Sequence, residues 1–291
     1  MRIELVHFIH SFPGAMRTAS LAVEVLAGYV GGSAKTLAFF PLDTLTTLRE
    51  VGAKGGPKRR LARYYAGCGL SLLGALPYAV LFHTAFWLVE GWLAAVPAYV
   101  QQLLAAMSGS IVAALVGVPF ECIKHRVQLG VAEYATPKLA VRTTLRREGL
   151  GGLYAGMGST LARNLPYNAF HFGTFRLAAD ALRRLHWSGG AVDVVAGAVA
   201  GAVTALITAP IDLVNTRLQT QAMSAAVAPL STSNFTGVGD ALVRIMQEEG
   251  GPAALMQGAG VRAIHYAPSA VIFFLVYEAV KKQALTMTTR I

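Results

Sequence analysis

The sequence predicts an all-α membrane protein with six transmembrane helices, and three observations support this fold class. Hydrophobic residues make up 54% of the 291 residues and charged residues only 14%, whereas about a quarter of a typical soluble domain is charged. Residues 64–89 and 91–120 contain no Asp, Glu, Lys or Arg, so each could span roughly 30 Å of hydrocarbon as a helix. One residue pattern also recurs three times, which indicates tandem repeats.

The repeated pattern starts with a proline at the end of an apolar run, and an acid follows two residues later. Its fullest copy, residues 119–128, adds Lys124, Arg126 and Gln128, and the other copies begin at Pro41 and Pro210. A second signature ends in a glycine that lies ten residues before another proline, and its copies end at Gly67, Gly156 and Gly258. Each repeat is therefore predicted to contain a long helix, a polar loop and a second long helix.

These two signatures together resemble those of the mitochondrial carrier family, over nearly the whole chain. Within the family, residues 40–44, residues 65–67 with 74–77, and residues 118–119 with Glu121 are similar to S-adenosylmethionine carriers. The resemblance implies one carrier domain over residues 1–291, in the mitochondrial inner membrane, with pseudo-threefold symmetry and repeats at about 19–97, 98–188 and 189–291. It also implies that cardiolipin binds near Gly67, Gly156 and Gly258.

The helices are expected in the following order. The first helix is predicted over residues 20–49, and the third and fifth carry the other two copies of the proline pattern. Short amphipathic helices, over 137–147 and 236–249, are expected to lie flat on the membrane surface. The equivalent segment of the first repeat, 55–64, is too short for more than a turn or two. The second, fourth and sixth helices are predicted over 70–95, 157–186 and 259–286.

The odd-numbered helices share two features. Pro41, Pro119 and Pro210 are expected to bend them, because proline removes a backbone hydrogen bond. Thirteen residues before each of these prolines begins a pair of small residues four apart, which allows a neighbouring helix to approach closely. The pairs are Gly28 with Gly32, Ala106 with Ser110, and Gly197 with Gly201.

The formal charge of +10 reflects membrane topology rather than nucleic-acid binding. Basic residues gather in the loops at 54–63 and 138–147, as expected for loops on one side of a membrane, and both termini are predicted on the other side. Cys68 and Cys122 stand apart from each other and from any His cluster, so we expect no disulfide, metal or cofactor. Residues 1–18 do not resemble a removable signal peptide.

The resemblance implies a matrix gate, in which the acid of each odd helix pairs with a base of the next. Asp43 and Lys124 form the one complete pair, because Glu121 would face Asn215 and Asp212 would face Thr46. Gln128 and Gln219 occupy the position of a bracing glutamine, which is Glu50 in the first repeat.

The resemblance also implies an opposite gate late in the even-numbered helices. Only the sixth helix has the full pattern, with Glu278 and Lys281. Arg176 takes an acid position in the fourth helix, and Glu90 takes a base position in the second. The network is either rewired, with Arg176 meeting Glu90 or Glu278, or has decayed.

The resemblance places the solute three residues before the prolines of the even helices, at Gly74 with Ala75, Arg163 with Asn164, and His265. An arginine in a membrane cavity needs an anionic partner, which the carboxylate of a solute could provide. Lys35 and Arg262 are further candidates. Alternatively, Arg163 pairs with an acid or a carbonyl of the protein itself.

Two functions follow from these expectations. The first is alternating-access transport of a small organic anion or zwitterion, either similar to S-adenosylmethionine or a carboxylate. The second is a structural or lipid-binding subunit of a large inner-membrane complex, in which the carrier fold persists with degenerate gates. We find no residues arranged for catalysis, so an enzyme is not expected.

Overall fold

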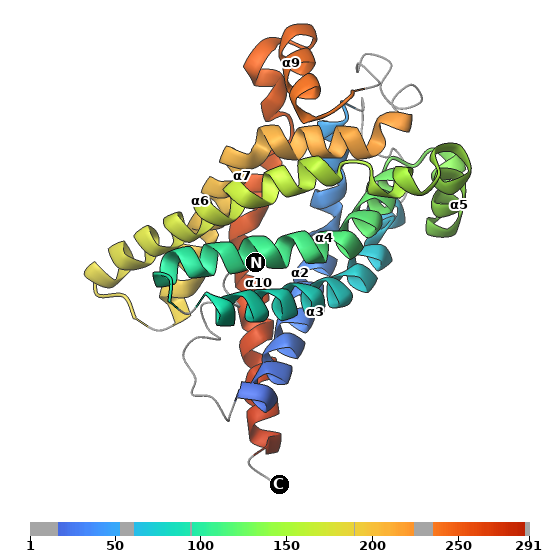
Figure 1. Cartoon of the computed structure of the whole chain (residues 1–291). Coiled ribbons are helices and arrows are strands. Elements are labelled where there is room, and N and C mark those ends of the chain that lie inside the picture. Colours follow the sequence, from blue (N-terminus) through green and yellow to red (C-terminus); the bar gives the residue numbers. More distant parts are fainter. Residues whose placement is uncertain (1–16, 53–60, 94, 189, 224–234, 289–291) are drawn as a thin grey trace.

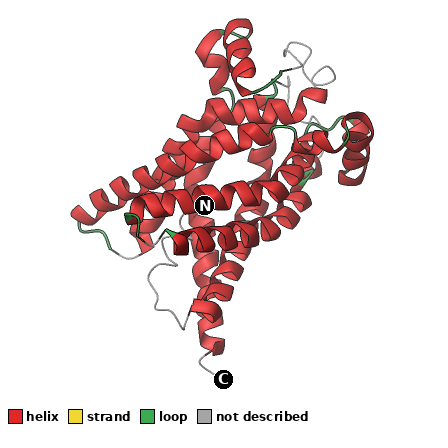
Figure 2. Ribbon diagram, in the orientation of Figure 1, coloured by secondary structure: helices red, strands yellow, loops and turns green. Residues whose placement is uncertain are grey.

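The computed structural model describes residues 17–52, 61–93, 95–188, 190–223 and 235–288. Every regular element in these ranges is helical, as predicted (Figure 2). The six long helices are α2 (Arg17–Glu50), α3 (Cys68–Trp92), α4 (Ala98–Gln128), α6 (Met157–Arg184), α7 (Gly190–Thr220) and α10 (Ala259–Thr288). Two shorter ones are α5 (Pro137–Glu148) and α9 (Val238–Glu248), and short 3-10 turns connect several of these elements.

The predicted helix boundaries agree with the structure to within about three residues. Each long helix contains one proline, and the odd helices continue past Pro41, Pro119 and Pro210 for two further turns. Membrane helices tolerate such prolines where neighbouring groups satisfy the freed carbonyl. The bend expected at these residues stays a prediction.

The six long helices form one bundle. Counted along the chain, the odd helices are α2, α4 and α7, and the even helices are α3, α6 and α10. Each even helix packs most extensively against the odd helix that follows it. These pairs are α3 with α4, α6 with α7, and α10 with α2, so the last helix closes onto the first. α2 begins and α10 ends at the lower end of the view, away from α5 and α9 (Figure 1). This arrangement fits the predicted topology of three repeats.

The predicted Ala106 packs in one cluster with Tyr78 and Phe82 of α3, and close helix contact also falls on glycines outside the predicted pairs. A Cβ atom on Gly31 would lie 3.0 Å from the Phe273 carbonyl oxygen of α10, and one on Gly109 would lie 2.8 Å from the Phe82 carbonyl oxygen of α3. Gly28 and Gly32 instead line a cavity. The spacing of small residues therefore located the right segment of α2, but it did not separate its packing face from its cavity face.

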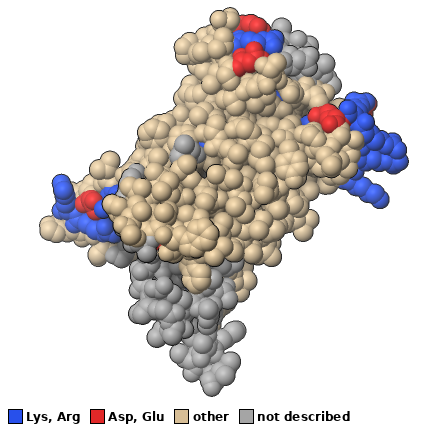
Figure 3. All heavy atoms as spheres, viewed as in Figure 1, with Lys and Arg blue, Asp and Glu red and all other residues tan. Residues whose placement is uncertain are grey.

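On the face shown in Figure 3, charged side chains gather at the margins of the molecule, and the surface between them is largely uncharged. Among the described residues, three segments are long and apolar enough by themselves to cross a membrane: 63–92, 100–128 and 190–223. These contain α3, α4 and α7. The other long helices are less apolar because charges such as Lys35, Arg163 and Arg262 lie within them.

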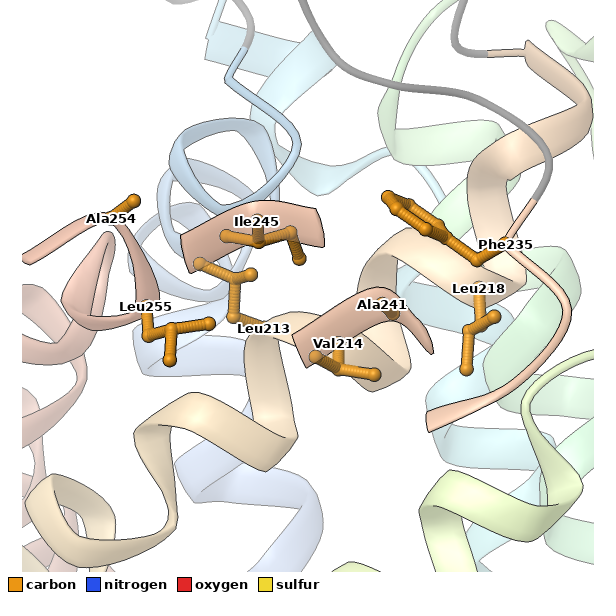
Figure 4. Close-up of a cluster of buried hydrophobic side chains, with 8 residues drawn as sticks. All are labelled: Leu213, Val214, Leu218, Phe235, Ala241, Ile245, Ala254 and Leu255. Atoms are coloured by element: carbon orange, nitrogen blue, oxygen red, sulfur yellow. The ribbon is translucent and has the colours of Figure 1, made fainter. Parts of the chain in front are cut away.

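The surface helices are anchored by separate apolar clusters. Phe235 and residues of α9 and the turn after it pack onto the C-terminal part of α7 in a cluster of eight residues (Figure 4). α5 has Thr136 as its N-cap and Pro137 at its first position, and its Ala140 packs against Ile123 and Val127 of α4. The first repeat has only the short turn Leu61–Tyr65 among its described loop residues. Repeats 2 and 3 thus carry a surface helix that the described part of repeat 1 lacks.

Candidate functional site

A cavity of about 300 Å³ lies inside the bundle, mainly among α2, α3 and α4, with contributions from α6 and α10. Its charged lining consists of Glu121, Lys124 and Arg163. Its wall is rich in aromatic side chains, namely Tyr29, Tyr78, Phe82, Phe120 and Phe273. The cavity therefore offers charges of both signs together with a surface suited to a flat apolar ring.

Lys124 and Asp43 join α4 to α2 near the C-terminal ends of these helices. The Lys124 Nζ lies 3.0 Å from Asp43 Oδ2, so the pair predicted from the sequence is present. Gln128 Nε2 donates to the same carboxylate oxygen at 2.9 Å, and the Thr47 hydroxyl donates to Gln128 Oε1 at 3.0 Å. Gln128 thus braces the pair at this interface.

At the interface between α4 and α7, Asn215 contacts Glu121, as predicted. Asn215 Nδ2 donates to Glu121 Oε1 at 3.4 Å, and Gln219 Nε2 donates to Asn215 Oδ1 at 3.3 Å. The stronger link, however, comes from Arg163 of α6. Its Nη1 lies 3.2 Å from Glu121 Oε1 and 3.5 Å from Asp212 Oδ1.

The interface between α7 and α2 differs from the prediction. The Thr46 hydroxyl donates to the Leu42 carbonyl of its own helix, and Asp212 pairs with Arg262 of α10 instead. Arg262 Nη2 also donates to Glu50 Oε1 at 2.7 Å, and the Thr216 hydroxyl donates to Glu50 Oε2 at 2.6 Å. Glu50, at the position of a bracing glutamine, is therefore one of the paired acids.

The expectation of a single complete ion pair at this end was wrong. Arginines from two even helices supply the positive charges that positions 46 and 215 lack, because their long side chains reach down to the acids of the odd helices. We call the whole set the matrix network: Asp43, Glu50, Glu121, Lys124, Arg163, Asp212 and Arg262. In this structure Arg163 pairs with acids of the protein itself, which was the alternative to a role in binding the solute.

A second set of buried ion pairs was missed in the sequence. Arg126 pairs with Glu148 at the end of α5, and its Nε donates to the Gln219 carbonyl oxygen at 3.0 Å. Arg217 likewise pairs with Glu249, and its Nε donates to the Glu50 carbonyl oxygen at 2.8 Å. Each arginine thus ties an odd helix to its own loop and to the end of the next odd helix.

The sequence did hold a signal for these pairs. Repeat 1 has Leu48 where the others have Arg126 and Arg217, and it also has no acid between Glu50 and Gly67. The base and the acid are thus absent together, as expected if they form one unit.

The opposite gate is only partly described. Glu90 is half-buried on α3, where its carbonyl accepts from Gln101 Nε2, and Arg176 is exposed on α6. The Lys281 Nζ lies 5.9 Å from the centre of the Tyr277 ring. The side chain of Glu278 lies outside the described residues. Arg176 forms no ion pair with any described residue, so the contact expected with Glu90 is not found.

The remaining candidate residues are distributed as follows. Gly74 and Ala75 line the cavity beside α4, and a Cβ atom on Gly74 would lie 2.9 Å from Phe120. Asn164 accepts from Arg163 Nη2 at 3.4 Å. Lys35 is half-buried on α2 and does not belong to the described lining of the cavity. The side chain of His265, on α10, lies outside the described residues.

Two glycines of the second signature, Gly67 and Gly258, contact the same network, and Gly156 contacts Asn215 and Gln219 beside it. Gly67 and Gly156 precede α3 and α6 with φ of 88° and 78°, a left-handed conformation that side chains disfavour. A Cβ atom on Gly67 would lie 3.3 Å from Lys124, and one on Gly258 would lie 3.1 Å from Glu50. The two signatures therefore meet in space between repeats. Cardiolipin binding near Gly67, Gly156 and Gly258 stays a prediction.

Comparisons with known proteins agree with this architecture. A family model described as "Mitochondrial carrier protein" matches residues 95–185 and 186–288. S-adenosylmethionine carrier 1, chloroplastic/mitochondrial, of Arabidopsis thaliana is 33% identical over 264 residues, which cover 88% of this chain and 77% of the relative. The mitochondrial S-adenosylmethionine carrier protein of Xenopus laevis is 32% identical over 223 residues, 73% of this chain and 81% of the relative. Mitoferrin of Caenorhabditis briggsae is 25% identical over 295 residues, 92% and 93% of the two chains.

The chain therefore belongs to the mitochondrial carrier family. It is a solute carrier, a multi-pass protein of the mitochondrial inner membrane, and its partner is a small-molecule solute. Some of its plant relatives are chloroplastic.

Proposed function

We propose that this carrier transports a small zwitterion with a carboxylate, similar to S-adenosylmethionine, by alternating access and without a chemical step. The observation that carries the proposal is the position of Arg163, which lines the cavity with Lys124 and Glu121. The two bases can receive a carboxylate and the acid can receive a cationic group, so the lining complements a zwitterion better than a dianion.

The wall of the cavity supports the same class of solute. Tyr78 and Phe82 stack at a centroid distance of 6.3 Å, and Phe120 faces the same space from α4. Such rings suit a flat heterocycle, and Tyr and Phe can also face a sulfonium or ammonium group. An adenosyl group with a cationic sulfur would meet both requirements.

The relatives provide a second line of support. The Arabidopsis and Xenopus proteins are named as S-adenosylmethionine carriers. The chain departs from that branch at Asn164, where the branch would have an acid, and at Lys35, which also replaces an acid. Lys35 is not in the described lining, so its charge bears less on the solute than its position in the sequence suggested.

A small carboxylate is the second candidate, because an arginine followed by an amide resembles the keto-acid and carboxylate carriers of the family. Arg163 and Asn164 form that pair here, with 3.4 Å between Nη2 and Oδ1. The structural-subunit role has no support from the relatives, whose names are those of carriers.

Thermal unfolding of the purified chain can test the substrate. The panel consists of S-adenosylmethionine, the thioether that lacks its methyl group and thus its sulfonium charge, adenosine, a small dicarboxylate and a cation without a carboxylate. A solute that binds only the folded protein stabilises it by about 2.7 kcal/mol at a hundredfold excess over its Kd. We expect S-adenosylmethionine to raise the Tm, Arg163→Gln to abolish that rise, and Arg142→Gln, on the exposed face of α5, to retain it.

The other outcomes separate the alternatives. A rise in Tm with the dicarboxylate alone would favour the second candidate. A rise with the cation that lacks a carboxylate would contradict the assignment of Arg163 to a solute carboxylate.

A further inference from the structure

Two arginines stand in the matrix network where the proline pattern supplies no base. Lys124 is the base of the second copy of the pattern, and the equivalent residues of the first and third copies are Thr46 and Asn215. Arg163 and Arg262 belong to α6 and α10, the even helices. The network therefore draws on helices that contribute no residue to the proline pattern.

The contacts form an alternating chain of charges. Arg163 bridges Glu121 of α4 and Asp212 of α7, and Arg262 bridges Asp212 of α7 and Glu50 of α2. The acids are screened from water, since only 4% of the Asp212 side chain and 2% of the Glu50 side chain is exposed. A buried acid that loses its base is left uncompensated, so each arginine is needed to hold its interface together.

The two arginines differ in access to the cavity. Arg163 belongs to the described lining of the cavity, whereas Arg262 does not. A solute carboxylate at Arg163 must compete with Glu121 and Asp212 for the same guanidinium. Such competition leaves the contacts of Arg262 with Asp212 and Glu50 in place, together with the pair of Lys124 and Asp43.

We propose that Arg163 and Arg262 are the bases of the matrix gate at the two interfaces whose motif bases are missing, and that a solute loosens the α4–α7 interface first by engaging Arg163. Arg262 is a positioning residue that acts on the gate alone. The solute part of this inference rests on the proposed function, whereas the gate part does not. A ligand can drive opening only by binding the open arrangement better, and competition for Arg163 provides such a difference.

The gate part can be tested without solute, by the thermal unfolding of the full chain in detergent. We expect Arg262→Gln and Arg163→Gln each to lower the Tm by roughly 6 °C or more, because the first leaves the buried Glu50 without its base and the second leaves Glu121 without its arginine. Asp212 keeps one arginine in either variant. Adding Thr46→Lys to the first variant and Asn215→Lys to the second restores the motif bases, and should recover at least half of each loss. Arg142→Gln is the control and should change the Tm by less than about 2 °C.

A new lysine could fail to fit, so a second measurement keeps the gate part falsifiable. In a double-mutant cycle of Arg262→Gln and Asp212→Asn, the combined loss should be clearly smaller than the sum of the single losses. Additive losses, together with no rescue by either lysine, would overturn the gate assignment.

Exchange by the rescued variants in liposomes tests the division of roles. The Arg262→Gln/Thr46→Lys protein should exchange solute, and the equally stable Arg163→Gln/Asn215→Lys protein should exchange at least tenfold less. A stable Arg262 variant without exchange would contradict its gate-only role. Exchange by the stable Arg163 variant would overturn the solute contact of the proposed function while the gate assignment still stands.

Discussion

Repeat 1 and repeats 2 and 3 solve the same packing problem with different chemistry. In repeats 2 and 3 a buried arginine, Arg126 or Arg217, joins the odd helix to an acid of its own loop. In repeat 1 the equivalent residue is the buried Leu48, and no acid follows in the loop. The comparison teaches that an ion pair is replaced as a unit, because removing one partner leaves a buried charge whereas removing both does not.

The interfaces between the odd helices change accordingly. Arg126 and Arg217 each donate to a backbone carbonyl at the end of the next odd helix, that of Gln219 and that of Glu50. The side chain of Leu48 cannot donate a hydrogen bond, so it makes no such contact with the end of α4. There the Gln128 side chain turns to Asp43 and to Thr44 instead. The α2–α4 interface is thus held by side chains of the two odd helices together with Arg63 of the repeat 1 loop, whose Nη2 donates to the Gly130 carbonyl oxygen at 2.8 Å. The other two interfaces depend on loops and even helices. The family model covers repeats 2 and 3, the two that keep the arginine and acid.

The largest expected effect comes from converting repeat 2 to the chemistry of repeat 1. Arg126→Leu alone should destabilise the fold by about 3–5 kcal/mol, because Glu148 then loses its buried partner. Adding Glu148→Gln removes the unpaired charge and should recover at least half of the loss. The readout is the Tm of the purified chain.

The control for this conversion is Leu48→Met, a volume-conserving change in repeat 1 that should cost less than about 1.5 kcal/mol. If the double variant loses as much as the sum of its single changes, Arg126 and Glu148 are not an energetic unit.

The helices and the Asp43–Lys124 pair could be predicted because their signals are local. Prolines at equal spacing fix the helix frame, and Lys124 lies on the odd-helix pattern that the family resemblance identifies. Arg163 and Arg262 could be placed on their helices but not given their partners. Their contacts depend on how far a guanidinium reaches between helices, which the spacing of residues along one helix does not contain.

The opposite error arose for Lys35 and Gly28. Both lie on the correct helix, but a count along the sequence does not fix which neighbouring helix or open space each residue meets. Lys35 was expected at the solute and is outside the described lining, whereas Gly28 was expected at a helix contact and lines the cavity. The two residues are seven apart and therefore only about 20° apart around the axis of α2, so the difference between them comes from what each residue meets at its own level and not from a rotation of the helix.

A middle-sized effect should distinguish the glycines that begin the even helices. Gly67 and Gly156 have similar φ, but a Cβ atom on Gly156 would lie 2.8 Å from Gln219 Cγ and 2.9 Å from Asn215 Oδ1, closer than the 3.3 Å at Gly67. Gly156→Ala should therefore cost more than Gly67→Ala, by about 1–2 kcal/mol of overpacking in addition to the backbone strain they share.

Gly52 provides a matched control for the strain itself. Its φ is 77°, and a Cβ atom there would meet nothing within 4 Å. Gly52→Ala should show only the cost of the left-handed conformation, about 1–2 kcal/mol. Equal losses of Tm at all three glycines would mean that packing of the new Cβ atom against Lys124, Asn215 and Gln219 adds nothing.

The smallest expected effect comes from an exposed ion pair of repeat 2, which isolates burial as the variable. Arg147 Nη1 lies 2.7 Å from Glu133 Oε2, with 56% and 51% of the two side chains exposed. The hydrogen bond that Arg147 donates to the Glu133 carboxylate raises the pKa of Arg147 further above its already high value. The pair therefore stays charged at neutral pH, and salt is the better probe. Arg147→Gln should lower the Tm by less than about 2 °C, and 0.5 M salt should remove most of that difference.

The same salt should leave the Arg126→Leu loss nearly unchanged, because the pair of Arg126 with Glu148 is shielded from ions. A loss at Arg147 as large as the one at Arg126 would show that charge itself, and not its burial between helix and loop, separates repeat 2 from repeat 1.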